Sequence, residues 1–240
     1  CDPRTGLRLP QNHVPGLQPR GELGANSGLN LYTNRSVAMT RASLSSLFAL
    51  LLLAGLWTGC SQKLDPPVQD DLSSAKYSLT AHDSTAVQFP ETYQGDVLVV
   101  SYIYTQCPDG CPMITANMKK VRSRLSSTEG VRFLTVTFDP ERDTPSRLAS
   151  YRSAYGIDAP TWDFLTGSPE TVDALMKRMN IRTSRTSTNP EAPADTTDTY
   201  FINHTDQITL IDADGRVRGE YMGSRTPPKY IVEDIQKVRS

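Results

Sequence analysis

The sequence is short of cysteine, histidine and net charge, and each shortage excludes a class of protein. Four cysteines in 240 residues are too few for a small disulfide-framework protein. A net charge of −1, from 25 basic and 26 acidic side chains, gives no electrostatic basis for binding nucleic acid. Three histidines and no second pair of closely spaced cysteines do not supply the four ligands of a structural zinc site.

The charge is also divided unevenly along the chain. Residues 1–59 carry five basic and two acidic side chains, whereas residues 60–240 carry 20 basic and 24 acidic ones. The sequence therefore predicts a mildly acidic body behind a basic leader. A hydrophobic fraction of 38% is enough for one ordinary core, and the length favours one domain with appendages.

The leader has the layout of a secretory signal. An apolar run of 14 residues, 44–57, follows Met39 and Arg41, and it is shorter than the roughly 20 residues that a membrane-spanning helix needs. Small residues lead to Cys60 and resemble the lipobox of bacterial lipoproteins, although Trp57 stands where that pattern prefers leucine. We expect Cys60 to be lipid-modified. The alternatives are an uncleaved short anchor, or cleavage nearby that leaves Cys60 free.

These features divide the chain into four predicted parts. Residues 1–38 are read as an upstream or disordered extension, and residues 39–59 as a signal peptide of the lipoprotein type. Residues 60–76 are polar and contain proline, which suits a lipid anchor and tether. Residues 77–240 form the predicted globular domain, exported and held at a membrane.

Apolar runs and helix-start signals predict the elements of this domain. We expect a short first strand pair around 87–89, buried strands over 96–104 and 131–138, and further strands over 162–165, 200–202, 207–212 and 216–221. We expect helices over 113–125, 144–155, 168–179 and from 226 onwards, each of the last three beginning with a cap and proline signal. Residues 183–199 read as an exposed loop.

The order of these elements predicts an α/β fold. Strands that alternate with helices indicate a largely parallel sheet covered on both sides. A β-hairpin at Asp214-Gly215 and a terminal helix close the chain. We therefore expect a thioredoxin-like fold, in which a central mixed sheet is flanked by helices.

The strongest chemical signal is the pair Cys107 and Cys111, which follows a buried strand and precedes a helix. A cysteine at a helix start has a stabilised thiolate, because free N–H groups and the helix dipole point at it. Three readings remain open here: an inert disulfide, a dithiol oxidoreductase and a soft-metal site. Two thiolates with one imidazole suit copper, particularly Cu(I).

The histidines decide whether such a third ligand exists. His13 lies in the leader, and His82 is most simply a surface residue beside the first strand. His204 sits at the end of a predicted strand, after the polar loop. A lone histidine at such a place is more often structural than a ligand.

Three motifs together resemble the Sco/SenC family of copper chaperones for cytochrome c oxidase. They are residues 104–112 (YTQCPDGCP), residues 139–145 (DPERDTP), and residues 203–205 (NHT) followed by 211–215 (IDADG). They occur in the family's order. This chain departs from the family at Asn203, where aspartate is frequent, and at Gly110, where a larger residue is common.

The resemblance implies that Cys107, Cys111 and His204 bind one copper ion. A ligating histidine usually donates its other nitrogen to a carbonyl or carboxylate. Asp139, at the end of the neighbouring strand, is either such a supporting residue or a turn residue of the DPERDTP loop. Within that loop, Arg142 and Asp143 are expected to pair with each other.

The resemblance further implies a membrane-tethered metallochaperone that delivers copper to the dinuclear copper centre of cytochrome c oxidase. Its partners would be the copper-site subunit of the oxidase, other periplasmic copper carriers or thiol reductases, and the membrane. The alternative is a thiol–disulfide reductase, with Cys107 and Cys111 as its redox-active pair, that keeps the oxidase cysteines reduced. A copper-responsive redox sensor is a third interpretation.

The remaining candidates are read as packing residues. Tyr102, Tyr104 and Phe138 are expected in the core or in the wall of the site. Met113 and Met118 have thioethers that can bind Cu(I), but their helical spacing favours core packing.

Overall fold

The computed structural model describes residues 65–187 and 200–239. Its strands are β1 (Asp70–Asp71), β2 (Tyr77–Ala81), β3 (Ala86–Phe89), β4 (Val97–Ile103), β5 (Val131–Thr137), β6 (Trp162–Gly167), β7 (Thr183–Ser187), β8 (Tyr200–His204), β9 (Ile208–Ile211) and β10 (Arg216–Tyr221). Its α-helices are α2 (Gly110–Arg124), α3 (Pro145–Ala154), α4 (Pro169–Arg178) and α5 (Pro228–Val238), with a short 3₁₀ helix at Glu91–Tyr93. The predicted signal peptide, Cys60 and residues 188–199 lie outside the described residues.

The core is one mixed sheet in the order β1-β10-β9-β4-β5-β6-β2-β3. Strands β4, β5 and β6 pair in parallel, with Val97 opposite Val131 and Phe133 opposite Trp162. Every residue of β4 is buried, as expected for a central strand covered on both faces. The strand therefore ends inside the molecule, and the loop that follows it begins at the buried Tyr104.

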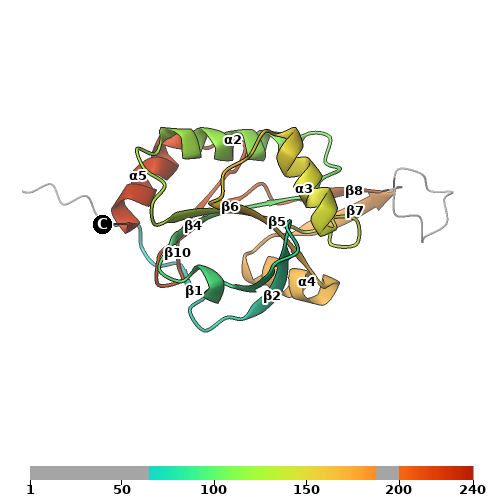
Figure 1. Cartoon of the computed structure of the whole chain (residues 1–240), viewed down its shortest axis with the longest axis horizontal. Coiled ribbons are helices and arrows are strands. Elements are labelled where there is room, and N and C mark those ends of the chain that lie inside the picture. Colours follow the sequence, from blue (N-terminus) through green and yellow to red (C-terminus); the bar gives the residue numbers. More distant parts are fainter. Residues whose placement is uncertain (1–64, 188–199, 240) are drawn as a thin grey trace, which may run out of the picture. The chain divides into compact units, whose positions relative to one another are not determined.

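Helices cover both faces of this sheet. Figure 1 shows α2, α3 and α5 on one side and α4 on the other. The hairpin β9–β10 turns at Gly215, whose φ of +84° is readily adopted only by glycine, and α5 closes the chain. This arrangement confirms the predicted thioredoxin-like layout.

The helix-start signals are confirmed at two of three places. Thr144 accepts a hydrogen bond from the N–H of Arg147, and Ser168 accepts one from the N–H of Thr171, each just before a proline. The prediction that Thr226 caps the last helix is wrong: α5 begins at Pro228 with Pro227 as its cap and no side-chain cap bond. Consecutive prolines fix this helix start through their restricted φ.

Two segments predicted to lack regular structure contain strands. Residues 183–187, the start of the predicted 183–199 loop, form β7 and pair with β8, from Thr183 opposite His204 to Ser187 opposite Tyr200. All five β7 side chains are exposed, so no apolar alternation marked the strand. In the predicted tether, Asp70–Asp71 pair with β10 and Leu72 is buried.

The prediction that Met113 packs in the core is wrong. It is 49% exposed near the start of α2, whereas Met118 is fully buried. The helix begins at Gly110 and not at residue 113, so Met113 lies in its first turn, outside the buried stripe. Within the described ranges, no helix combines the length and the apolar character required to cross a membrane.

Candidate metal centre

Cys107 and Cys111 lie where β4 ends and α2 begins. Cys111 is fully buried in the first turn of the helix, and Cys107 is partly exposed in the loop before it. The N–H of Cys111 donates to Sγ of Cys107 (3.4 Å), and the N–H of Tyr104 points at Sγ of Cys111 (3.5 Å). Both sulfurs therefore accept backbone hydrogen bonds, which favour negative charge on them.

His204 completes the cluster from the end of β8. Its Nε2 lies 3.5 Å from Sγ of Cys111 and 4.0 Å from Sγ of Cys107. The three atoms lie within 4.8 Å of one another. Its Nδ1 lies 2.9 Å from the carbonyl oxygen of Thr205, which leaves Nε2 turned towards the sulfurs.

Two aromatic rings hold the imidazole in place, as predicted for the wall of the site. The Phe138 ring centroid lies 4.8 Å from that of His204, and the Tyr104 ring meets it edge-on at 6.2 Å. Of the other histidines, His82 packs against Phe164 near the first strands, and His13 lies outside the described residues. In the described part of the chain, this is the one cluster of three metal-ligating side chains.

The donor set fits a soft metal. Two sulfurs and one imidazole nitrogen at short mutual distances suit Cu(I), since thiolates are soft ligands. Closed zinc sites use four protein ligands, and no fourth such ligand joins this cluster within residues 65–187 and 200–239. The partial exposure of Cys107 leaves one side of the cluster reachable from solvent.

The two thiols differ strongly in acidity. Hydrogen bonding from Cys111, and then from His204, lowers the pKa of Cys107 far below its usual value of 9. Burial, and then the neighbouring Cys107 thiolate, raise the pKa of Cys111. Burial opposes protonation of His204, but its hydrogen bonds to Cys107 and Thr205 outweigh burial and raise its pKa. The pair is therefore a partly exposed thiolate beside a buried thiol.

We predict that alkylation distinguishes these two cysteines. A folded-state pKa far below 9 keeps Cys107 ionised as the pH falls from 9 to 6, so its reaction with iodoacetamide should change little over that range. Cys111 should react at least about tenfold more slowly, since it is buried and protonated. Peptide mass spectrometry of the reduced chain measures both rates. A Cys107 rate that falls about tenfold per pH unit below 9 would contradict the assignment.

The DPERDTP loop lies beside the cluster, but its charged side chains pair with other residues than predicted. The predicted Arg142–Asp143 pair is wrong: Arg142 pairs with Asp139 (2.5 Å), and Asp143 accepts hydrogen bonds from Thr105 and Thr137. The N–H groups of Arg142 and Asp143 both donate to the carbonyl oxygen of Asp139, and the two side chains then bond different partners. The carboxylate of Asp139 faces Arg142 and Tyr200, while the imidazole of His204 has the Thr205 carbonyl as its partner.

Tyr200 and Gln106 contact this network and were not singled out from the sequence. The Tyr200 hydroxyl donates to Asp139 (2.7 Å), and Oε1 of Gln106 accepts from Arg142 (2.9 Å). Gln106 directly precedes Cys107, and this position could have marked it as a residue of the site. Tyr200 follows a polar segment, and no pattern in the sequence marks it.

Comparison with known proteins gives a consistent result. A family model described as SCO1/SenC matches residues 66–240. The SCO1 protein homolog of Bacillus subtilis is 28% identical over 150 residues, which are 61% of this chain and 72% of that protein. A SCO1/SenC family lipoprotein from Bacillus anthracis str. Ames has a crystal structure with 26% identity and a TM-score of 0.61, covering 74% of this chain and 99% of that one. The structure of Bradyrhizobium japonicum ScoI with copper bound shares the fold at 24% identity, with a TM-score of 0.54 over 68% of this chain and 97% of that one.

Proposed function

This chain belongs to the SCO1/SenC family, and on that premise we propose that it is a copper chaperone tethered to a membrane. Its cargo is one copper ion held by Cys107, Cys111 and His204, and its recipient is the dinuclear copper centre of cytochrome c oxidase. A related solved structure, that of BsSco, is described as a member of the Sco family of cytochrome c oxidase assembly proteins. The cluster of two sulfurs and one imidazole nitrogen within 4.8 Å is the observation that carries the proposal.

Partial exposure of one ligand suits delivery rather than permanent storage. Cys107 is the more exposed of the two sulfurs, and Cys111 is buried. Transfer then proceeds by ligand exchange, in which thiolates of the recipient replace the two cysteines one at a time. At each step one cysteine of this chain leaves as one thiolate of the recipient binds. The copper therefore keeps two thiolates and the imidazole of His204 through both exchanges.

Membrane attachment follows from the leader. The basic, apolar and small-residue layout that ends at Cys60 supports export and lipidation of that cysteine. A related family protein, that of Bacillus anthracis, is a lipoprotein. An anchored domain shares a surface with a membrane-bound recipient, and this confinement raises the effective concentration of each for the other.

A transfer assay tests the proposal. The copper-loaded full chain, mixed with the copper-free copper-site domain of a cytochrome c oxidase, should pass its copper on, as measured by metal analysis after separation. The His204→Ala variant should hold copper at least about tenfold more weakly, because loss of a ligand exceeds the usual effect of outer residues. No transfer from the wild-type chain, together with unchanged affinity in the variant, would overturn the proposal.

The same cysteines support a second candidate, a thiol–disulfide reductase for the oxidase cysteines. A partly exposed thiolate beside a buried thiol is the arrangement in which one sulfur attacks a disulfide and the other resolves the mixed intermediate. The copper-free dithiol should then reduce an oxidised recipient domain, ending with Cys107 and Cys111 oxidised. Equal reduction rates for wild type and His204→Ala, without copper transfer, would favour this reductase.

A further inference from the structure

The strand that carries His204 belongs to a small sheet of its own. Strands β7 and β8 form a two-stranded sheet, separate from the eight-stranded sheet whose strand β4 leads into the loop of Cys107. Figure 1 shows this hairpin extending beyond the helices. His204 is held near the cysteines from two sides: by the short link to β9, which pairs with β4, and by contacts between the hairpin and the loops beside the main sheet.

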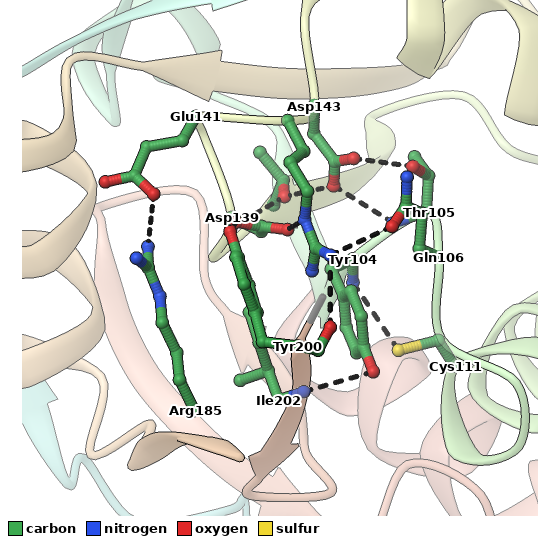
Figure 2. Close-up of polar contacts among 12 residues, drawn as sticks. Tyr104, Thr105, Gln106, Cys111, Asp139, Glu141, Asp143, Arg185, Tyr200 and Ile202 are labelled. Carbon is green, nitrogen blue, oxygen red and sulfur yellow. Dashed lines mark hydrogen bonds and ion pairs between the residues drawn. The ribbon is translucent and has the colours of Figure 1, made fainter. Parts of the chain in front are cut away.

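Arg142 makes the central contacts of this kind. Its guanidinium is buried, with Nε 2.5 Å from Asp139 Oδ2. Its Nη1 donates both to Oε1 of Gln106 (2.9 Å) and to the carbonyl oxygen of Tyr200 (3.1 Å). One planar group thus bonds the residue before Cys107 and the first residue of the strand that ends at His204. Figure 2 shows its partners Gln106, Asp139 and Tyr200.

Tyr200 fixes the other side of this junction. The Arg142 guanidinium carbon lies 3.7 Å from the centroid of the Tyr200 ring, and the Tyr200 hydroxyl donates to Oδ1 of Asp139 (2.7 Å). Backbone, ring and hydroxyl of one hairpin residue are therefore all held by the Arg142–Asp139 pair. A stack of a cation on an aromatic ring stabilises most where the cation is shielded from water. The Arg142 side chain is shielded in this way, because it is buried.

Among the described residues, the other ion pairs and hydrogen bonds that join the hairpin to the rest of the domain are exposed or single. The ion pair between Arg185 and Glu141 is 50% and 43% exposed, and exposed pairs contribute little. The N–H of Ile202 donates to the hydroxyl of Tyr104 at 3.2 Å, a buried but single neutral bond. Arg142 differs from the first because it is buried, and from the second because it bonds both Gln106 and Tyr200 and also stacks on the Tyr200 ring.

We infer that Arg142 is a positioning residue that holds the His204 strand against the cysteine loop, and so sets the geometry of the metal cluster. As far as copper is concerned, the inference rests on the proposed function. A lysine keeps the positive charge but has neither the planar face that stacks on Tyr200 nor the fork that reaches two acceptors. Arg142→Lys therefore removes the link and leaves the charge that faces Asp139.

Hydrogen exchange of the copper-free full chain tests the positioning directly. In Arg142→Lys, the N–H groups of Ile202 and Thr205 should exchange about tenfold faster than in wild type, while those of β4 should not change. The matched control is Arg218→Lys, which alters a second arginine that pairs with a buried aspartate, Asp212, at the opposite end of β4. It should leave both exchange rates unchanged.

Copper loading supplies the second readout. Arg142→Lys should bind copper about tenfold more weakly, as is usual when residues behind a ligand are altered. The nitrogen hyperfine signal of His204 in the Cu(II) electron paramagnetic resonance spectrum should also weaken. If wild type binds no copper, the proposed function fails, and the exchange rates of the copper-free chain still decide the role of Arg142.

Wild-type exchange at Ile202 and Thr205 in Arg142→Lys would overturn the inference. So would equal acceleration in Arg218→Lys, since the effect would then be one of general stability. Should Arg142→Lys fail to fold, Tyr200→Ala removes the ring stack and the hydroxyl bond of this link, while the bond to the backbone carbonyl and the Arg142–Asp139 pair stay in place. It should reproduce the faster exchange, and wild-type exchange there would overturn the inference equally.

Discussion

The full chain with Cys107→Ser and Cys111→Ser together should lose its bound copper, from one ion per chain to none that survives dialysis. The change removes two of the three ligand atoms that lie within 4.8 Å of one another. A serine hydroxyl is a hard, neutral donor, whereas Cu(I) selects soft thiolates, so His204 alone is left as a suitable ligand. Metal analysis after dialysis measures the loss.

Cys60 provides the control for this experiment. Cys60→Ser changes a thiol outside the predicted ligand set and should retain full copper loading. Serine is nearly isosteric with cysteine, so the double variant should keep the fold, which circular dichroism can verify. Copper retained at wild-type stoichiometry by the folded double variant would place the metal elsewhere in the chain.

The largest effect on stability should come from Asp139→Ala. Asp139 and Arg142 form a buried ion pair with side-chain exposures of 0% and 2%, and the alanine leaves the guanidinium buried without this carboxylate. Removing one partner of a buried pair costs about 3–5 kcal/mol of unfolding free energy. The same change removes the acceptor of the Tyr200 hydroxyl. Urea unfolding followed by circular dichroism measures the difference.

A surface pair gives the matched comparison. Asp70 pairs with Arg178 at exposures of 38% and 43%, and Asp70→Ala should cost less than about 1 kcal/mol because solvent screens that pair. If Asp139→Ala costs no more than Asp70→Ala, then the Arg142–Asp139 pair contributes nothing to the fold. A Tyr200→Phe variant should fall between them, since it removes one hydroxyl and keeps the ring.

Local sequence patterns predicted the elements of the main sheet well. The buried runs over 96–104 and 131–138 became β4 and β5, because a strand covered on both faces is apolar at every position. The signals at Thr144 and Ser168 worked because a cap bond and a proline act within a single turn. Strand β7 carried no such mark: its five side chains are exposed, and its pairing with β8 lies in the backbone.

The three residues of the candidate metal cluster were predictable from the sequence, but the residues that hold the cluster in place were not. Chemical type and motif order pointed to Cys107, Cys111 and His204, which the fold brings together across a separation of 93 residues between the last two. The partners of Asp139 and Arg142 were not predictable, since neighbours in the sequence suggested an Arg142–Asp143 pair. Loop turns after β5 decide which way each side chain points, and those turns are set by contacts with other segments.

By itself, the sequence determined which atoms are available for chemistry: two cysteines at a helix start and one strand-end histidine, with His82 beside the first strands as the other histidine of residues 77–240. Only the tertiary structure decided how they differ, because burial and hydrogen bonding are properties of the folded surroundings. Cys107 became the partly exposed, acidic sulfur, Cys111 the buried one, and His204 a candidate ligand carried by a hairpin outside the main sheet. Because His204 lies on this hairpin, its position depends on contacts such as those of Arg142 and Tyr200, which join the hairpin to the neighbouring loops. Sequence spacing does not reveal these contacts.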